Sequence, residues 1–260
     1  MSDQPTPGRP YIEFVHVWKS FGEQAVLCDV SFNVRRGEVV VVLGRSGVGK
    51  SVTLKHILGF LRPDEGQVYV DGHEVSSLAE EELFAVRRRV TMVFQSGALF
   101  DSLSVGENVA YPLRERSARE AALSEGRIQA QVDDLLKRVD LLEARDLMPA
   151  DLSTGMKRAV AIARALAADP DCLLYDEPTT MVDPLMARTI GDLILKLKRQ
   201  TGLTSVVVTH DMKLARKLAD RMVFLVDGRV AFFGPASQLN ASPEPLIHEF
   251  IEFDQVPFLA

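Results

Sequence analysis

Apolar and polar positions follow two different periods along the chain, and the change of period predicts where strands and helices lie. Residues 11–21 and 25–34 show the alternation and the β-branched and aromatic content of strands. Residues 37–44 read GEVVVVLG, an apolar run typical of a strand buried on both faces. Residues 50–61 then place apolar side chains at helical spacing, so we expect this strand to lead into a helix.

The rest of the chain repeats this succession of strand and helix, apart from one long helical stretch. The further predicted segments are a hairpin or edge pair over 66–75, a helix over 79–89, strands over 90–95, 172–178 and 204–210, helices over 154–168, 184–202 and 211–220, and a hairpin over 221–234. Alternation of strands with helices predicts a mostly parallel sheet in an α/β fold. The helical stretch, about residues 96–160, interrupts the alternation and is predicted to form a separate lobe.

The composition is that of an ordinary globular protein with an acidic charge balance. The 260 residues suffice for one large domain with a lobe, and 36 acidic against 30 basic residues give a net charge of −6. This balance argues against non-specific nucleic-acid binding and against docking on anionic lipid by charge alone. Cys28 and Cys172 are far apart and outside any metal-binding or C-x-x-C spacing, so both are predicted to be reduced core thiols of a cytoplasmic protein.

No apolar run in the sequence has the length of a membrane span. The longest runs, 39–43 and 222–226, have the length of strands and fall well short of the roughly 18 residues that a spanning helix needs. The polar first ten residues are not followed by the apolar stretch of a signal peptide. We therefore expect any work on a membrane to pass through partner chains.

The segment between the buried strand and its helix, GRSGVGKS, fits the phosphate-loop pattern G-x-x-x-x-G-K-[ST] in the strand–loop–helix context that this pattern requires. Glycines let backbone N–H groups turn toward phosphate oxygens, and the helix N-terminus adds the positive end of its dipole. Lys50 is expected to contact the β- and γ-phosphates, and Ser51 to ligate Mg²⁺. A glycine-rich turn without a ligand is the alternative. The predicted nucleotide contacts in this segment are Gly44, Arg45, Ser46, Gly47, Val48, Gly49, Lys50, Ser51 and Val52.

An acidic pair follows the apolar run of the strand predicted over 172–178. Asp176 is expected to hold Mg²⁺, directly or through water, as the second half of a magnesium–nucleotide site. Glu177 is expected to polarise the attacking water as the general base, because adjacent residues at a strand end point in different directions. The alternative is a solvated acidic turn before Pro178.

Two further polar residues end predicted strands. His210 ends the strand over 204–210, where it can donate a hydrogen bond to the γ-phosphate and orient the water. Gln95 ends the strand over 90–95, and its amide can bridge Mg²⁺ and the water without adding charge. Taken alone, each is equally a structural polar residue at a strand end.

The segment LSTGM at residues 152–156 resembles the LSGGQ signature of ABC transporter ATPases, and with it the motifs above occur in the order of that family. The resemblance implies that the chain is an ATPase with ATP and Mg²⁺ as cofactors. It also implies a P-loop NTPase (RecA-like) α/β core with a mostly parallel sheet, an N-terminal antiparallel β subdomain and an inserted α-helical lobe. The implied boundaries are an ATP-binding domain over 11–240, with its core over about 11–95 and 161–240 and its lobe over about 96–160, and a tail over 241–260.

In that family the signature meets the γ-phosphate held by the other subunit, so the resemblance implies a head-to-tail homodimer with two sites. Ser153, Thr154 and Gly155 are then nucleotide contacts, although Ser153 is also a good helix N-cap and a bare cap is the alternative. Phe21 resembles the aromatic residue that stacks on adenine, with a core strand residue as the alternative. Asp183 lies in a segment that resembles the D-loop, near the dimer seam.

Several positions depart from the usual pattern of the family. Thr154 replaces a glycine and Met156 a glutamine in the signature, and Met181 and Val182 are unusual in the D-loop. These departures bear on the rate of hydrolysis and on phosphate geometry at the signature, and less on binding at the phosphate loop.

A narrower resemblance concerns the cargo. The run FQSGALFDSLSVGENVAYPLRE at 94–115 is similar to the ATPases of Mla/Mce-type lipid transporters, in which methionine at position 156 also occurs. It implies an integral membrane permease and an MCE-domain substrate-binding protein as partners, phospholipid or another hydrophobic cargo, and a location at the cytoplasmic face of the inner membrane. An importer of small polar solutes, or a soluble ABC ATPase acting on nucleic acid or ribosomes, are the alternatives.

The tail over 241–260 carries an apolar set, Leu246, Ile247, Phe250, Ile251 and Phe253, followed by VPFLA. Such a tail either packs on its own domain or clasps the other protomer.

Overall fold

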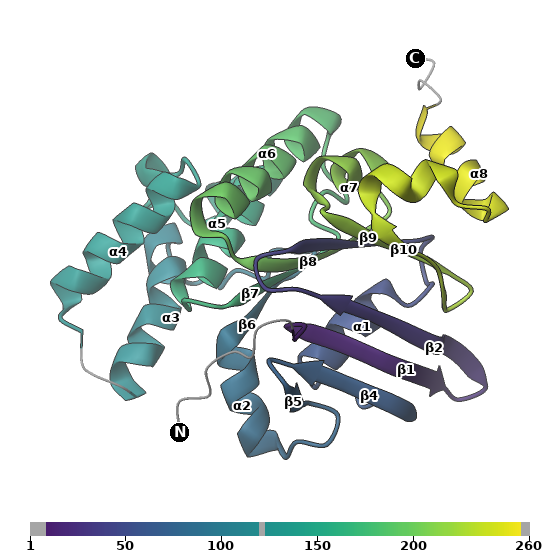
Figure 1. Ribbon diagram of the computed structural model, residues 1–260. Helices are drawn as coiled ribbons and strands as arrows, with labels where there is room; N and C mark the ends of the chain where they lie inside the picture. The colour runs from purple at the N-terminus through teal and green to yellow at the C-terminus, as the bar shows by residue number, and fades with distance from the viewer. Residues whose placement is uncertain (1–8, 120–122, 256–260) are drawn as a thin grey trace. The chain divides into compact units, whose positions relative to one another are not determined.

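Segments near both ends of the chain fold together, and the middle of the chain forms a second unit (Figure 1). The computed structural model describes residues 9–119 and 123–255, so most of the polar N-terminal segment and the last five residues of the tail lie outside the described residues. Unit 1 comprises residues up to 87 and from 204 onward, and unit 2 comprises residues 88–203. The predicted lobe lies within unit 2, and its predicted boundaries stay a prediction.

Unit 1 contains an antiparallel sheet and the strands that flank the phosphate loop. Its elements are β1 (Ile12–Phe21), β2 (Gln24–Val34), β3 (Val39–Leu43), α1 (Lys50–Ile57), β4 (Glu65–Val70), β5 (His73–Glu74), β8 (Thr204–Thr209), α7 (Met212–Leu218), β9 (Arg221–Val226), β10 (Arg229–Pro235), η3 (Ala236–Ala241) and α8 (Pro245–Gln255). The helix α2 (Glu80–Arg89) begins in unit 1 and ends in unit 2. The antiparallel strand order β2-β1-β4-β5 confirms the predicted N-terminal β subdomain.

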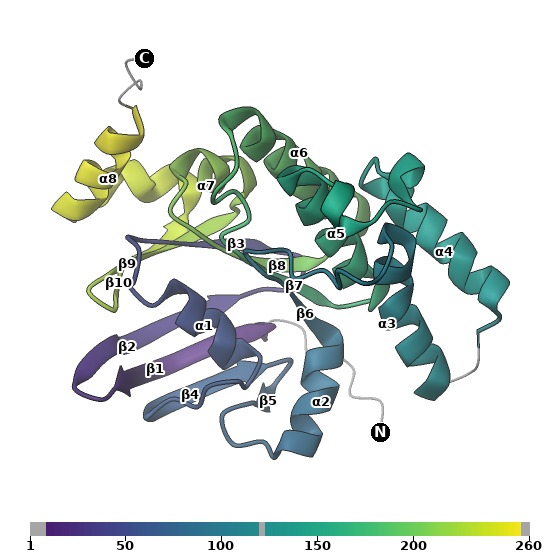
Figure 2. The ribbon, with the colours of Figure 1, turned by 180° about the vertical axis from the view of Figure 1, so that it is seen from behind.

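The buried strand β3 is the centre of unit 1. It pairs in parallel with β8 on one side and with β9 on the other, and β10 pairs antiparallel with β9. Every residue of β3 is buried, as its uninterrupted valine run predicted. α1 packs between this sheet and the antiparallel sheet, through contacts with β8 and β4, whereas α7 contacts β3 and β8 from the opposite face (Figure 2).

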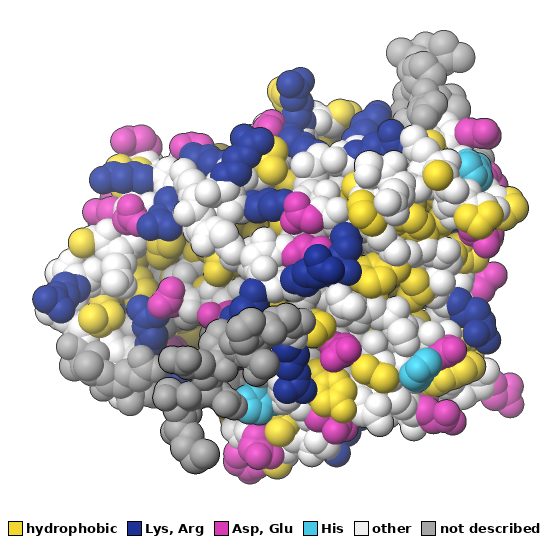
Figure 3. Space-filling model, viewed as in Figure 1, with side chains coloured by type: hydrophobic (Ala, Val, Ile, Leu, Met, Phe, Trp, Pro, Cys, Tyr) yellow, Lys and Arg dark blue, Asp and Glu magenta, His cyan; other side chains and the backbone are white. Residues whose placement is uncertain are grey.

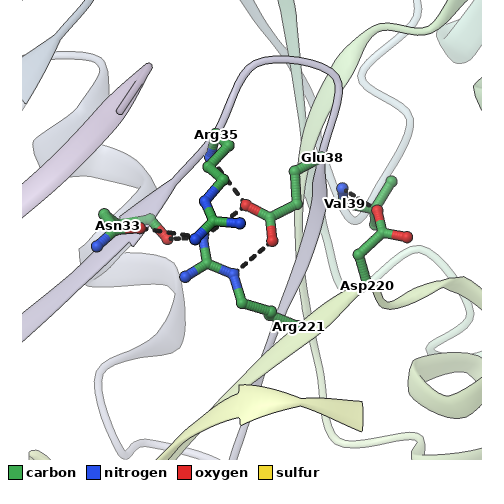
Figure 4. Close-up of polar contacts among 6 residues, drawn as sticks. All are labelled: Asn33, Arg35, Glu38, Val39, Asp220 and Arg221. Atoms are coloured by element: carbon green, nitrogen blue, oxygen red, sulfur yellow. Dashed lines mark hydrogen bonds and ion pairs between the residues drawn. The ribbon is translucent and has the colours of Figure 1, made fainter. Parts of the chain in front are cut away.

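A polar network anchors the chain at the start of β3 (Figure 4). The Arg221 guanidinium pairs with the half-buried Glu38 carboxylate and donates to the Asn33 carbonyl oxygen at 3.0 Å. The backbone N–H of Arg35 donates to the same carboxylate at 2.8 Å, and the backbone N–H of Val39 donates to Asp220 at 2.8 Å. The strand that carries the phosphate loop is thereby tied at its amino end to β2 and to β9.

Unit 2 is built around a single buried helix, α5. Its elements are β6 (Val90–Val93), α3 (Val105–Arg119), α4 (Glu125–Arg138), η1 (Leu142–Ala144), η2 (Pro149–Asp151), α5 (Thr154–Ala167), β7 (Cys172–Asp176) and α6 (Pro184–Thr201). α5 contacts α3, α4, α6 and β6, and the side chains of residues 158–163 on it are buried. β6 pairs in parallel with β7. These parallel strands and the helices around α5 confirm the predicted α/β class.

The largest differences from the sequence prediction concern two helices. The first helix ends at Ile57 rather than near residue 61, because Gly59 adopts a φ of +65° and its N–H, with that of Phe60, bonds back to the last turn. The tail contains a helix, α8, for which we predicted no element. Ile247 and Ile251 of α8 are buried, and the Phe250 ring lies 5.1 Å from that of Phe224, so the described part of the tail packs on unit 1.

The remaining global predictions concern the cysteines and the membrane. Cys172 is a buried free thiol whose pKa is raised by burial, as expected of an inert core residue, whereas Cys28 is only half-buried. Among the described residues, no helix is long and apolar enough to cross a membrane. On the face drawn in Figure 3, Lys and Arg side chains lie interspersed with Asp and Glu side chains.

Candidate functional site

The phosphate loop connects the buried end of β3 to the first residue of α1. Gly44, Gly47 and Gly49 have φ values of +154°, +81° and +107°, which L-residues with a Cβ rarely adopt. A Cβ on Gly44 would also lie 2.8 Å from the carbonyl oxygen of Leu225, and one on Gly49 would lie 2.7 Å from the Leu27 side chain. The spacing of glycines in the motif therefore corresponds to the places where this backbone turns sharply and packs closely.

The cation predicted from the motif is buried within the loop. Lys50 is 6% exposed, and its ammonium donates to the carbonyl oxygens of Gly44 at 2.9 Å and Arg45 at 3.0 Å. The helix that begins at Lys50 has no acidic residue in its first turn, so its own sequence leaves the positive end of its dipole uncompensated. A buried ammonium and a helix N-terminus together form an electropositive site suited to phosphate.

His210 comes to the same sheet edge as the phosphate loop. Thr209, the last residue of β8, pairs with Leu43, the last residue of β3, so His210 and Gly44 follow paired positions of adjacent parallel strands. His210 is exposed there, and Asp211 next to it caps α7 by accepting from the Leu214 N–H at 2.9 Å. The structure thus brings together the phosphate loop and the predicted γ-phosphate contact.

Phe21 is the last residue of β1 and is 47% exposed, so it is not the core residue of the alternative interpretation. The Lys19 ammonium lies 5.7 Å from the centre of its ring. An exposed ring at a strand end is available for stacking on a planar base. Its role as the adenine contact rests on this exposure and on the resemblance.

The acidic pair and Gln95 share a sheet edge in unit 2. Val93 at the end of β6 pairs with Tyr175 of β7, so Gln95 and the pair Asp176–Glu177 leave adjacent parallel strands at the same end. Gln95 is exposed, Asp176 is half-buried, and Glu177 is 8% exposed. The carboxylate predicted to hold the metal therefore faces more solvent than the carboxylate predicted to act as base.

Glu177 is held in an unusual backbone conformation. Its φ is +46°, which is rare for a residue with a side chain, and such strain concentrates at functional sites. The Thr180 hydroxyl donates to its carboxylate at 3.0 Å, and the Thr180 N–H donates to its carbonyl oxygen at 3.2 Å. The solvated turn of the alternative interpretation does not describe this buried, hydrogen-bonded carboxylate.

The signature segment forms the N-terminus of α5. The Ser153 hydroxyl accepts from the Met156 N–H at 3.3 Å and caps the helix, while Ser153 and Thr154 are both exposed. Gly155 is buried. A Cβ added to it would lie 1.8 Å from the Met186 sulfur, so the Met186 side chain packs directly over this glycine. Ser153 therefore does cap α5. Because Ser153 and Thr154 are also exposed, a phosphate from outside the chain can reach them.

The D-loop segment starts α6 and exposes apolar side chains. The Asp183 carboxylate accepts from the Met186 N–H at 2.9 Å and caps this helix. Met181 has a φ of +61° and is 86% exposed, and Leu185 is 75% exposed. The D-loop segment thus presents two large apolar side chains to solvent next to the helix cap.

The predicted residues thus fall into two groups. Unit 1 holds the phosphate loop, residues 44–52, with Phe21 and His210, and unit 2 holds Gln95, the signature at 153–155, the acidic pair and Asp183. Sequence reasoning did not single out Thr180, Met186 or Arg158. Thr180 contacts Glu177, Met186 contacts Asp183 and Gly155, and Arg158 bonds to the backbone of Phe94 and Thr180. The signals for them were a hydroxyl three residues after an expected base and an arginine on the buried face of a predicted helix.

The oxygen donors of both groups suit Mg²⁺. The predicted ligands are the Ser51 hydroxyl, the Gln95 amide and the Asp176 carboxylate, and Mg²⁺ prefers oxygen ligands. It is usually held by one or two carboxylates together with substrate phosphates, which fits a set with a single carboxylate. The donor set therefore fits a magnesium–nucleotide complex.

The sequence profile of the ABC transporter family matches residues 27–180 of the chain. The chain belongs to the ABC transporter ATP-binding family. It is 37% identical to the intermembrane phospholipid transport system ATP-binding protein MlaF of Escherichia coli K12 over 231 residues, which cover 89% of this chain and 84% of MlaF. It is also 39% identical to the methionine import ATP-binding protein MetN of Brucella abortus over 240 residues, which cover 92% of this chain and 64% of MetN.

Solved structures agree with this assignment to the ABC family. A dimeric ATP-binding cassette in a post-hydrolysis state, bound to ADP and Pi, superposes with a TM-score of 0.78 at 35% sequence identity. The match covers 86% of this chain and 98% of that chain. The ABC family and the P-loop core with its antiparallel β subdomain are therefore confirmed, and the chain is the ATP-binding, ATP-hydrolysing subunit of a transporter.

Proposed function

We propose that this ABC ATPase closes around Mg-ATP as a head-to-tail homodimer, with the phosphate loop of one copy facing the signature of the other. The observation that carries the proposal is the buried Lys50 in its glycine-shaped loop, with His210 on the adjacent strand end. The exposed Ser153 and the apolar Met181 and Leu185 supply a surface for the second copy. A related cassette, 35% identical to this chain, is a dimer in a post-hydrolysis state bound to ADP and Pi, which supports a nucleotide-bound dimer here.

The residues of the chain then divide the work of hydrolysis. Lys50 and the loop N–H groups bind the β- and γ-phosphates, and Ser51, Gln95 and Asp176 hold the metal. Mg²⁺, when bound, neutralises charge on the phosphate oxygens. Glu177 accepts a proton from the attacking water as that water bonds to the γ-phosphorus and the bond to the β-phosphate oxygen breaks.

Other residues sense whether the γ-phosphate is present. His210 donates to the γ-phosphate, and the exposed Ser153 of the facing copy contacts it as well. Loss of the γ-phosphate removes the bridge between the copies, so ATP favours the closed dimer and ADP the open one. Phe21 stacks on the adenine.

The variant Glu177→Gln tests the assignment of the base. It keeps the size and most hydrogen bonds of the side chain but removes the proton acceptor, so we expect turnover to fall about 100- to 1,000-fold. ATP affinity should stay close to that of the wild type, and a dimer should accumulate in size-exclusion chromatography with Mg-ATP. Glu143→Gln, the same change at an exposed residue of η1, is the control. Wild-type turnover in Glu177→Gln would rule out this base.

We further propose phospholipid, or a related hydrophobic molecule, as the cargo. The similarity to MlaF over most of both chains supports this, as does the segment 94–115, which resembles Mla/Mce-type ATPases. That segment exposes Phe94, Phe100 and Tyr111, and the rings of Phe100 and Tyr111 lie 4.9 Å apart. Exposed aromatic side chains fit contact with a permease at the cytoplasmic face of the inner membrane.

Import of a small polar solute is the second candidate, because the identity to MetN equals that to MlaF within a few per cent. The two candidates predict different partners. Affinity purification of the full chain from membranes in mild detergent should recover an integral permease together with an MCE-domain protein and bound phospholipid. Recovery of a permease with a binding protein for a polar solute would favour the second candidate, and recovery of RNA without a permease would contradict both.

A further inference from the structure

Arg158 is a buried cation on the second turn of α5, the helix whose N-terminus is the signature. It is 4% exposed, and its guanidinium donates to the carbonyl oxygen of Phe94 at 3.0 Å and to that of Thr180 at 3.3 Å. Among the described residues its Nε has no hydrogen-bond partner. Burial lowers the pKa of Arg158 by desolvating its charge. Within the part of the chain that the structure describes, its hydrogen-bond partners are these two backbone carbonyl groups, which offset only part of the cost of burying its charge.

The two carbonyl groups flank the residues that handle water and metal in the proposed mechanism. Phe94 directly precedes Gln95. Thr180 closes the turn that begins at Glu177, and its hydroxyl donates to the Glu177 carboxylate at 3.0 Å. Arg158 therefore bonds directly to the backbone of the residue before Gln95. It is linked to the Glu177 carboxylate through Thr180, which accepts from Arg158 and donates to that carboxylate.

A second arginine of the same helix offers a contrast. Arg164 lies six residues further along α5 and donates to the carbonyl oxygens of Gly97 at 3.2 Å and Ala98 at 2.8 Å. Burial lowers its pKa too, and its guanidinium lies 5.3 Å from the Phe100 ring. Arg164 thus holds the segment after β6 and also donates to the Asn108 side chain of α3 at 3.4 Å, whereas Arg158 joins the end of β6 to the turn of Glu177.

We propose that Arg158 is a positioning residue that fixes the spacing between Gln95 and Glu177 and links both to the signature helix. The proposal rests on the proposed roles of these two residues. The planar guanidinium suits this task, because its fork of N–H groups spans two acceptors in a fixed geometry that an ammonium or an amide does not reproduce. It also gives the left-handed backbone at Glu177 a support beyond its own turn.

The proposal has a consequence for the dimer. Ser153 caps α5 five residues before Arg158, so the element that would touch the facing copy's ATP also holds the base of its own site. A displacement of α5 on closure would reach Glu177 through Arg158 and Thr180. The two sites of a dimer should therefore be coupled through this arginine.

The test is steady-state ATPase kinetics of the full chain with Arg158→Met, which keeps the apolar stem and removes the donors. We expect kcat to fall about 10- to 100-fold, because small misplacements of catalytic groups have effects of this size, with KM for ATP changed less than about three-fold. Arg158→Lys should recover only part of kcat. Arg164→Met, the same change at a half-buried arginine of the same helix, is the control for loss of stability, and we expect it to lower kcat several-fold less than Arg158→Met.

A double-mutant cycle separates positioning from mere stabilisation. If Arg158 acts through Glu177, Arg158→Met should reduce single-turnover hydrolysis in the Glu177→Gln background much less than in the wild type. Addition of guanidinium ion at tens of millimolar to Arg158→Ala should restore part of kcat, provided that circular dichroism shows the variant to be folded. Wild-type kcat in Arg158→Met, or equal losses in both backgrounds, would overturn the inference and leave the proposed function intact. Wild-type turnover in Glu177→Gln would instead overturn the proposed base.

Discussion

The two groups of site residues are built in different ways. The phosphate loop of unit 1 takes its shape from glycines, at Gly44, Gly47 and Gly49, and its buried lysine bonds to the carbonyl oxygens of the loop itself. In unit 2, by contrast, non-glycine residues hold positive φ values, +46° at Glu177 and +61° at Met181. The first geometry is encoded locally, and the second depends on contacts from distant parts of the chain.

This difference determines which side chains each region needs. Glycine adopts the left-handed region at little steric cost, whereas another L-residue gives up about 1–2 kcal/mol there. The turn of Glu177 offsets this cost through the Thr180 hydroxyl and through Arg158, which lies 22 residues before Thr180 in sequence. The phosphate loop should therefore tolerate substitutions outside its motif, whereas the turn of Glu177 should respond to substitutions in distant segments of the chain.

The largest effect should come from placing a Cβ in the phosphate loop. Gly44→Ala combines a φ of +154° with a contact of 2.8 Å to a backbone oxygen, which no side chain can relieve. We expect a loss of about 2–4 kcal/mol, which appears as a lower thermal midpoint or as roughly 30- to 1,000-fold weaker ATP binding. Fluorescent nucleotide titration and thermal denaturation measure both. A Gly44→Ala variant with unchanged stability and ATP affinity would show that the conformation of the phosphate loop does not depend on this glycine.

The matched substitution in unit 2 should cost less stability, and a second substitution should restore much of it. Gly155→Ala meets only the Met186 side chain, and its backbone is helical, so we expect a loss of about 1–2 kcal/mol in the free energy of unfolding. Met186→Ala should restore much of that stability in the double variant, because it removes the atoms in contact. No recovery in chemical denaturation would mean that Gly155 is required for another reason, such as close approach to a phosphate.

The contrast also explains how far the sequence predicts this protein. Strands, their parallel order, the phosphate loop and the acid pair follow from local patterns, because apolar runs, glycine spacing and strand-end carboxylates lie close together in sequence. The end of α1 does not follow from such a pattern, because the apolar spacing continues past Gly59, where the helix has already ended. The sequence prediction also lacks α8, because it assigns no helical period to the apolar residues of the tail.

The side chains that hold unit 2 together were beyond local patterns for a physical reason. Nothing in the sequence around Arg158 says which carbonyl groups it will reach, because Phe94 is 64 residues away. In the same way, Gly155 is a signature residue by motif, yet its packing beneath Met186 appears only when α5 and α6 are placed side by side.

A smaller effect is expected at the tip of the signature. Thr154 is exposed as the first residue of α5, and its β-branched side chain stands at the position of the first glycine of the LSGGQ signature that the segment resembles. Thr154→Gly should raise steady-state ATPase activity a few-fold, equivalent to about 1 kcal/mol in the barrier, at a slight cost in helix stability. Thr189→Gly, at an exposed position of α6, controls for the loss of helix propensity. Unchanged or lower turnover in Thr154→Gly would count against a phosphate contact at this tip.

The smallest effect tests whether the phosphate loop is as self-contained as the comparison implies. Arg45 of the loop pairs with Glu249 of α8 at 3.0 Å, but the two side chains are 66% and 45% exposed. Exposed pairs contribute about 0–1 kcal/mol, so Glu249→Gln should change ATP affinity by less than about five-fold, and the difference should vanish at high salt. Glu252→Gln on the same helix is the control, with isothermal titration at two ionic strengths as the measurement. A larger loss that persists in salt would mean that α8 helps to set the loop, and that the phosphate loop, like the turn of Glu177, depends on a distant segment.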